Sequence, residues 1–182
     1  MKRSVLILLA LVLAVVALHA QTPSHRRGLW FAAGFGMGNL RTSCDSCGRA
    51  GSGAASHFAL RAGVSLFPSF LLGVEFDKLT SQRNTDAVSA IHLTSYFYPV
   101  REGNVFLKAG LGRSFFDSKT PHSPDAQHGG IGLMAGVGFD LRATTKISLT
   151  PMFTVLHARQ TTGGPGPTQE TAFAVSIGVT FH

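Results

Sequence analysis

The chain has 182 residues, of which 45% are hydrophobic and only 14% are charged, whereas soluble domains carry about 25% charged residues. Glycine is abundant, with 21 residues, but it follows no collagen period and lies mostly among apolar residues. This composition excludes fibrous proteins and argues against a disordered chain, and the length predicts one domain. The formal net charge of +7 is modest, so we expect no nucleic-acid partner.

The N-terminus has the features of a secretory signal peptide. Lys2 and Arg3 precede an unbroken apolar run, 5–18, and the small residue Ala20 stands before the polar Gln21. The run is shorter than the roughly 20 residues that a spanning helix needs. The basic flank and the small residue predict cleavage after Ala20, with a retained N-terminal anchor as the alternative. A lipoprotein anchor is excluded, because no cysteine lies near the boundary.

From residue 28 onward the sequence alternates with period two in eight segments, which is typical of β-strands. In the clearest segment, Ile131, Leu133 and Val137 alternate with mostly glycine and polar residues. The eight predicted strands are 28–38, 58–66, 70–77, 87–98, 105–112, 130–142, 147–155 and 172–181. They are longer than the usual strand of about 5 to 6 residues and match tilted strands that cross a bilayer. No later stretch approaches roughly 18 consecutive apolar residues, so no transmembrane helix is predicted.

The connections between the predicted strands alternate between short and long. Three are short turns, at 68–69, 99–103 and 143–145. The four others are longer and polar, at 39–56, 79–86, 117–129 and 159–171. Short turns and both termini on one side, with long loops on the other, are the topology of an outer-membrane barrel. We therefore predict an all-β fold, an eight-stranded antiparallel up-and-down transmembrane barrel.

The two faces of the predicted strands distinguish a membrane barrel from a soluble one. In hydrocarbon every backbone amide needs a partner, which only helices and closed sheets provide. One face is made of Phe, Leu, Val and Ile, and the other of Gly, Ser, Thr and charged residues. A soluble lipocalin-like barrel would point the large apolar side chains inward and leave Arg61, Glu75 and Lys108 outside. We expect the apolar face to contact lipid.

The alternating strands and loop lengths resemble the small eight-stranded outer-membrane barrels of Gram-negative bacteria, such as the transmembrane domain of OmpA and its short relative OmpX. We accordingly expect three parts: a signal peptide (1–20), a periplasmic segment (21–27) and an outer-membrane barrel (28–182). Members of this family end on an aromatic residue that the assembly machinery reads. Phe181 fits, with Val179 and Ile177 in phase, although His182 follows it. The expected partners are outer-membrane lipid, lipopolysaccharide and this machinery, and we expect a monomer without a cofactor.

Several charged residues fall on the inward face of the predicted barrel. They are Arg61, Glu75, Lys108, Asp140 and Arg142. Eight strands enclose just enough room for side chains, and buried charge must be paired, so we expect a polar network that fills the lumen. A narrow polar pathway is the alternative. The alternate glycines of 34–38 lie in a strand with no helix after it, so they should relieve crowding in the lumen rather than bind phosphate.

Two motifs in the predicted long loops contain residue types that form disulfides, bind metals or act in catalysis. Cys44 and Cys47 face an oxidising compartment, so we expect a loop disulfide between them. A free or metal-bound pair is the alternative, with His57 as the only nearby further ligand. The nearest cluster of the kind that a lipid-modifying enzyme uses is His122, Ser123 and Asp125. It lies between prolines, with nothing to hold a base against a nucleophile, so we expect no catalytic residue and no metal site.

Four basic residues end the outward register of the strands that run from a short turn to a long loop. They are Arg41, Lys78, Arg113 and Arg159. Phe35, Phe76 and Phe115 lie nearby in the same registers, as in an interfacial aromatic belt. Because arginine and lysine pair strongly with phosphate oxygens, the set indicates contact with lipopolysaccharide; ordinary interface charge is the alternative. We expect no enzyme but a structural or interaction scaffold that displays four loops, with a narrow channel and a lipid-modifying enzyme as alternatives.

Overall fold

The computed structural model describes residues 28–44, 51–81, 87–101, 103–117, 128–160 and 168–182. The predicted signal peptide (1–20), the periplasmic segment (21–27) and the cluster at 122–125 lie outside the described residues. Cys47 also lies outside them, so its disulfide with Cys44 stays a prediction. Within the described ranges, no helix is long and apolar enough to cross a membrane.

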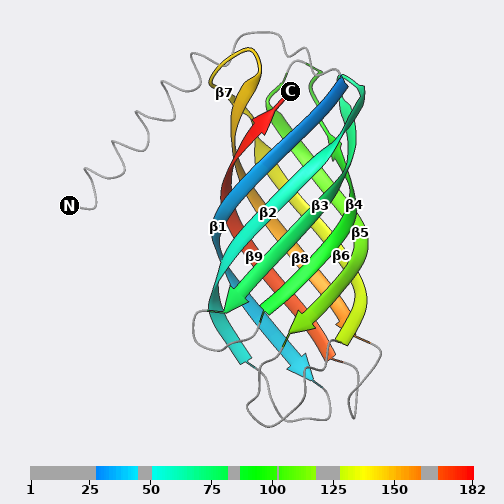
Figure 1. Ribbon diagram of the computed structural model, residues 1–182, viewed down its shortest axis with the longest axis vertical. Coiled ribbons are helices and arrows are strands. Elements are labelled where there is room, and N and C mark those ends of the chain that lie inside the picture. Colours follow the sequence, from blue (N-terminus) through cyan, green and yellow to red (C-terminus); the bar gives the residue numbers. More distant parts are fainter. Residues whose placement is uncertain (1–27, 45–50, 82–86, 102, 118–127, 161–167) are drawn as a thin grey trace, which may run out of the picture.

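The described residues form a closed antiparallel sheet (Figure 1). Its strands are β1 (Gly28–Cys44), β2 (Gly51–Phe67), β3 (Phe70–Ser81), β4 (Ala87–Phe97), β5 (Val105–Asp117), β6 (His128–Phe139), β7 (Leu141–Arg142), β8 (Ile147–Gln160) and β9 (Thr168–Phe181). β1 pairs with β2 and β9, and β6 pairs with β5 and β8, so the sheet has no open edge. β7 continues β6 after Asp140 and pairs with the same β8. β6 and β7 therefore make one barrel strand, and the predicted eight-stranded barrel is confirmed.

The strands are tilted, as closure of a sheet requires. Following the paired residues once around the barrel from Gly34 in β1 leads back to Cys44 in the same strand, ten positions further along. A row of partners therefore climbs toward the long-loop end, by about 1.25 residues at each of the eight strands. This stagger decides which side chains lie at the same height.

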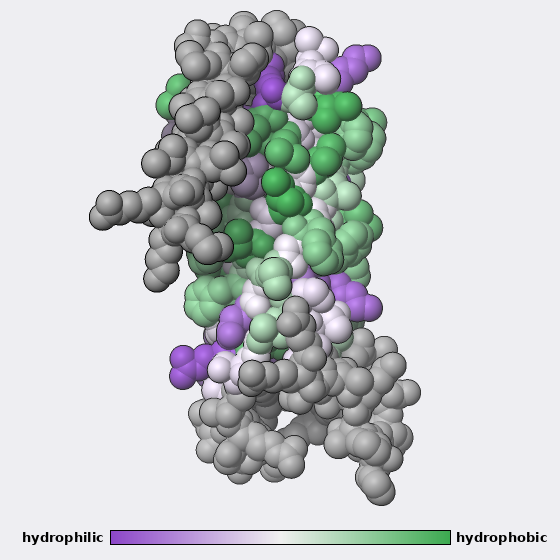
Figure 2. Space-filling model, turned by 90° about the vertical axis from the view of Figure 1, so that its left-hand side faces the viewer, coloured by the Kyte–Doolittle hydropathy of each residue, from purple (hydrophilic) through white to green (hydrophobic). Residues whose placement is uncertain are grey.

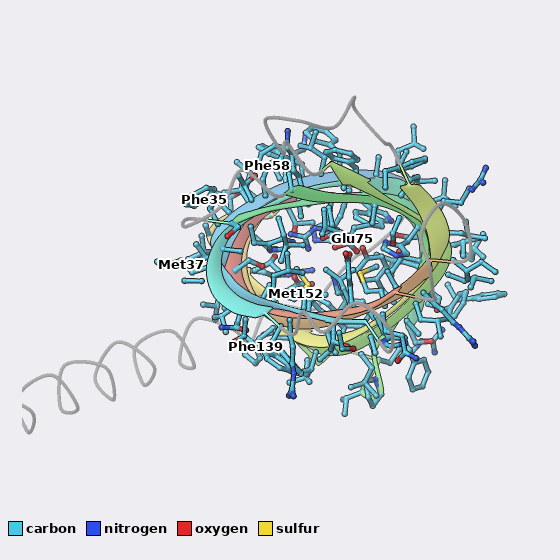
Figure 3. All side chains as sticks on the ribbon, turned by 90° about the horizontal axis from the view of Figure 1, so that it is seen from below. Phe35, Met37, Phe58, Glu75, Phe139 and Met152 are labelled. Carbon is cyan, nitrogen blue, oxygen red and sulfur yellow. The ribbon has the colours of Figure 1, made fainter. Side chains whose placement is uncertain are left out.

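The predicted alternation places the apolar side chains outside the barrel. On β6, Ile131 is 67% exposed, whereas Met134 is only 3% exposed. Phe35 and Phe58 point away from the barrel, whereas Glu75 points into it (Figure 3). One face of the molecule shows an apolar band with hydrophilic residues near both of its ends (Figure 2). This arrangement is the reverse of a soluble barrel, whose large apolar side chains fill the inside.

The short turns and both described ends of the barrel lie at one end of the molecule (Figure 1). The turn between β4 and β5 is closed by a hydrogen bond from the amide of Gly103 to the carbonyl of Val100, at 2.8 Å. In the last short turn, the amides of Ala143 and Thr144 donate to the carbonyl of Ile147. These bonds satisfy backbone groups where the ladder ends.

The predicted extent of the long loops is wrong, because the strands continue past the apolar band. The segment 39–56 was expected as one loop, yet the β1–β2 ladder runs on to the pair Thr42 and Gly51. β8 likewise reaches Gln160, and β9 starts at Thr168. Ladder hydrogen bonds need only backbone groups, so they persist where the side chains are polar and the hydropathy pattern fades.

Stability should depend on the depth of a lipid-facing charge. Val74 is 51% exposed and lies in the middle of β3, four positions from both Phe70 and Lys78. We expect Val74→Arg to lower the free energy of unfolding by about 2 to 4 kcal/mol, because the charge lies near the midplane. The matched change Val105→Arg, at the short-turn end of β5, should cost about 1 kcal/mol or less. Reversible urea unfolding in lipid measures both, and equal costs would contradict the assigned faces.

Candidate functional site

The centre of the lumen is a carboxylate held by groups from three strands. Glu75 of β3 accepts hydrogen bonds from Lys108 Nζ of β5, at 2.6 Å, and from Tyr96 Oη of β4, at 2.7 Å. The Nε atom of Arg61, on β2, lies 3.9 Å from the same carboxylate. All four side chains are buried. The structure thus brings together three of the five charged residues that the sequence assigned to the lumen, and adds a tyrosine.

Glycines make the room that the Arg61 guanidinium occupies. Gly34 and Gly178 are paired across β1 and β9. A Cβ atom at Gly34 would lie 2.7 Å from Arg61 Nη2, and one at Gly178 would lie 2.8 Å from it. Any side chain at either position would displace the guanidinium. Gly34 therefore gives space to a large polar group on another strand, whereas a Cβ atom at Gly36 or Gly38 would meet the backbone of β9.

Asp140 belongs to a second polar group nearer the short turns. Its carboxylate accepts hydrogen bonds from Tyr98 Oη, at 2.7 Å, and from Thr150 Oγ1, at 3.0 Å. Thr150 also lies 2.9 Å from Thr180 Oγ1. Arg142 lies at the end of this region and is half-buried. Asp140 therefore accepts hydrogen bonds from hydroxyl groups, in a group nearer the short turns than that of Glu75.

A third polar group, which the sequence reasoning did not assemble, lies nearer the long loops. His57 Nε2 lies 2.8 Å from Asp77 Oδ1, and His92 Nδ1 lies 3.6 Å from Asp77 Oδ2. The three side chains come from β2, β3 and β4 and have no exposed surface. The inward positions of all three follow from period two, but their pairing depends on register. Among the described residues, no group of His, Cys, Asp and Glu is placed to hold a metal ion.

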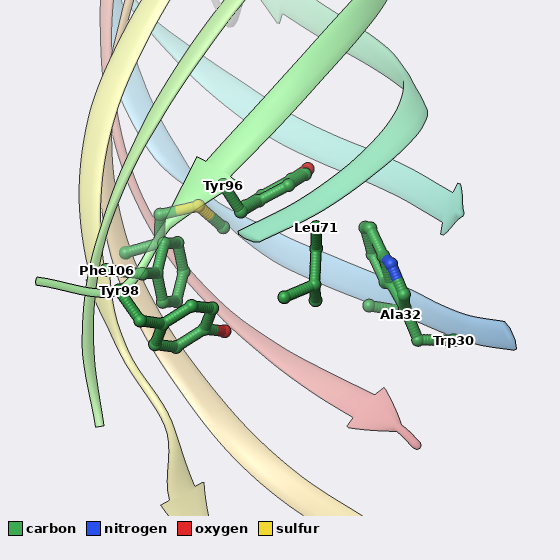
Figure 4. Packing of buried hydrophobic residues seen from close by; sticks show 7 residues of the cluster. Trp30, Ala32, Leu71, Tyr96, Tyr98 and Phe106 are labelled. Atoms are coloured by element: carbon green, nitrogen blue, oxygen red, sulfur yellow. The ribbon is translucent and has the colours of Figure 1, made fainter. Parts of the chain in front are cut away.

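Apolar clusters lie in the lumen on both sides of the Glu75 group and the His57–Asp77–His92 group. Toward the short turns, Trp30 meets Tyr96 edge-on at 5.1 Å between ring centroids, and Phe106 lies 5.7 Å from Tyr96; Figure 4 shows this packing. Toward the long loops, the cluster consists of Leu40, Ala55, Leu79, Val88, Met134, Leu156 and Ala172. The sequence reasoning described the inward face by its glycines and polar residues and did not predict these clusters, although their side chains occupy the same register as the inward charges.

The four predicted basic residues lie on the outside, near the long-loop ends of their strands. Arg41, Lys78, Arg113 and Arg159 are all exposed. The carboxylates are placed in the opposite way. Where the structure describes the side chain, every carboxylate is buried, and these residues are Glu75, Asp77, Asp140 and Glu170. Among the side chains that the structure describes, the exterior near these groups therefore carries cations and no carboxylate.

Solved structures with the same architecture exist, at low sequence identity. Neisserial surface protein A matches with 14% identity and a TM-score of 0.60, over 83% of this chain and 96% of that one. Ail, the attachment invasion locus protein of Yersinia pestis, was solved with the heparin analogue sucrose octasulfate. It matches with 10% identity and a TM-score of 0.57, over 85% and 99% of the two chains. The fold is that of the small eight-stranded outer-membrane barrels. No protein-family model and no curated protein sequence matches the chain.

Removing the central carboxylate should destabilise the barrel strongly. We expect Glu75→Gln to lower the free energy of unfolding by about 3 to 5 kcal/mol, because Lys108 and Arg61 then stay buried without a counter-charge. Adding Lys108→Met removes one of these cations. The double variant should therefore lose less than the sum of the two single variants. Urea unfolding of the barrel in lipid measures the cycle, and strictly additive losses would show that the two groups are not coupled.

Proposed function

We propose that the protein is an outer-membrane scaffold that displays its long loops outside the cell and contacts lipopolysaccharide through Arg41, Lys78, Arg113 and Arg159. The observation that carries this proposal is the separation of charge, since the described carboxylates are buried while these four basic groups are exposed. At a membrane interface, a long basic side chain keeps its stem on the acyl chains while its head reaches the phosphate layer. Phosphate oxygens are strong partners for such groups. The sulfated sugar bound to Ail is a polyanion on a barrel of the same fold.

The filled lumen supports a scaffold over a narrow channel. Between its two ends lie an aromatic cluster, the Glu75 group, the His57–Asp77–His92 group and the apolar cluster around Leu79. An ion would have to displace these side chains, all of which are buried. The same burial argues against catalysis, because the His92 ring lies near both Ser114 and Asp77 yet has no exposed surface for a substrate to reach.

The last strand supports the second expected partner, the assembly machinery that reads an aromatic C-terminal residue. In β9, Ile177 and Val179 point outward and are 53% and 37% exposed. Phe181 ends the same register and stacks on Phe31 of β1, at 4.7 Å between ring centroids. We infer that the machinery recognises this apolar edge before β9 closes against β1. The strand then becomes the seam of the finished barrel.

The orientation in the membrane is tested by labelling from outside. Ser52 at the long-loop end of β2 and Ala143 in a short turn are both exposed. In a background with Cys44 and Cys47 changed to serine, a membrane-impermeant thiol reagent on intact cells should label Ser52→Cys and not Ala143→Cys. Permeabilised cells should give label at both positions. The reverse pattern would overturn the orientation, and chain found only in the soluble periplasmic fraction would overturn the membrane location.

The lipopolysaccharide contact is tested by changing all four basic residues to glutamine. One screened surface contact is worth about 1 kcal/mol or less, so a single substitution will have little effect. The fourfold variant should retain several-fold less lipopolysaccharide on purification and make cells more sensitive to agents that disrupt the outer leaflet. Heat-modifiable gel migration should be unchanged, because the lumen is untouched. Retention equal to the parent at equal expression would leave the residues as ordinary interface charge.

A further inference from the structure

The register places two of the four exposed basic residues on either side of one apolar residue. Arg113 of β5 and Arg159 of β8 are both paired with Ile131 of β6. Their Cα atoms are thus two strand spacings apart, or about 10 Å. All three side chains point outward, and Ile131 is 67% exposed. Two long arginine side chains at this spacing can reach one group placed between them.

The other two basic residues extend this pair into an arc. Lys78 is paired with Ser89, two positions from Ile91, which is the β4 partner of Arg113. Arg41 is paired with Thr171, whose β8 partner is His157, two positions from Arg159. Each of these steps spans about 12 Å between Cα atoms. The arc therefore follows β3, β4, β5, β6, β8, β9 and β1 with nearly even spacing.

The arc is open at β2. The β2 partner of Arg41 is Ser52, whereas the β2 partner of Lys78 is Phe58, six positions away. Six positions along a strand add about 20 Å, and among the residues that the structure describes no basic side chain bridges this side. The outward residues between these partners on β2 are Ala54 and Ser56. The barrel thus has a basic side and, at the same end, a side with small uncharged residues.

The stagger of the strands also sets the heights of the basic groups. A row of partners climbs by about 1.25 residues per strand. Along the barrel axis, Arg159 therefore lies about 6 Å closer to the long-loop end than Arg113. Ile131 lies between the two heights, so the Arg113 side chain approaches its exposed surface from the short-turn side and the Arg159 side chain approaches it from the long-loop side. Below Ile131, the outward side chains of β6 are apolar, with Leu133 53% and Val137 40% exposed. A phosphate between the two arginines and an acyl chain along Leu133 and Val137 correspond to the two parts of a phosphorylated lipid.

We propose that one lipopolysaccharide molecule binds on the β5–β6–β8 face, with a lipid A phosphate between Arg113 and Arg159 and an acyl chain along β6. This inference rests on the proposed contact with lipopolysaccharide and goes further, because it makes the contact one-sided. The β2 side binds no lipid phosphate. Lys78 and Arg41 flank the bound molecule and add little to its affinity.

Native mass spectrometry of lipid retained by the folded barrel tests this site. The barrel is extracted from phosphatidylcholine nanodiscs that contain diphosphorylated lipid A, monophosphorylated lipid A or phosphatidylglycerol. We expect Arg113→Gln/Arg159→Gln to lower lipid A retention by about tenfold, as for the loss of two charge-assisted bonds. The matched control Arg41→Gln/Lys78→Gln removes the same charge and should lower it by about threefold or less. Heat-modifiable migration confirms that each variant is folded.

The outcomes separate this inference from the proposed function. Equal losses in the two double variants would overturn the one-sided site while the general contact with lipopolysaccharide stands. Phosphatidylglycerol retained as strongly as lipid A, and lost in the same variant, would overturn the assignment to lipopolysaccharide in favour of any anionic lipid. Unchanged retention in the variant with all four residues replaced would overturn both proposals. A tenfold loss confined to Arg113→Gln/Arg159→Gln with lipid A supports the site.

Discussion

The structure depends on one constraint, that every backbone amide inside a bilayer must have a hydrogen-bond partner within the protein. The chain meets it by pairing β9 with β1, which leaves no open edge among the described strands. Closure brings tilt, and the ten-residue offset between Gly34 and Cys44 is its measure. Once the sheet is closed, successive side chains along a strand point alternately to the lipid and to the lumen. The apolar register faces lipid, so the polar register must fill a narrow interior.

That interior explains the abundance of glycine and the pairing of the lumen charges. An eight-stranded barrel has room for side chains but not for side chains from every strand at every height. Gly34 and Gly178 leave the space that Arg61 fills, and Glu75 then meets cations that would otherwise be buried alone. Such a packed lumen cannot change much without losing stability. The surfaces that this packing leaves free are the long-loop end and the lipid-facing rim.

The sequence predicted the faces well and the contacts poorly, for a physical reason. Side-chain direction along a strand is local, so alternation sufficed to place Ile131 outside and Glu75 inside. Contacts in the lumen depend on the offset between strands, which no single segment encodes. Glu75 is the ladder partner of His92, yet its hydrogen bonds go to Tyr96 and Lys108, further along β4 and on β5. The loop limits failed differently, because backbone ladders continue beyond the apolar band.

The same offset between strands also determines how the four exposed basic residues are arranged around the barrel. The sequence alone places one basic residue at the long-loop end of each of four strands, and this spacing suggests a symmetric ring. The four residues are Arg41, Lys78, Arg113 and Arg159. Register turns the ring into an arc, because Arg113 and Arg159 share Ile131 as a neighbour while Arg41 and Lys78 are six positions out of step across β2. At this end of the barrel, the exposed basic groups of the described strands are thus denser on the β5–β6–β8 side than on the β2 side. A lipid with several phosphates responds to that local density, because contacts that share one ligand gain from each other in a way that evenly spread charges do not.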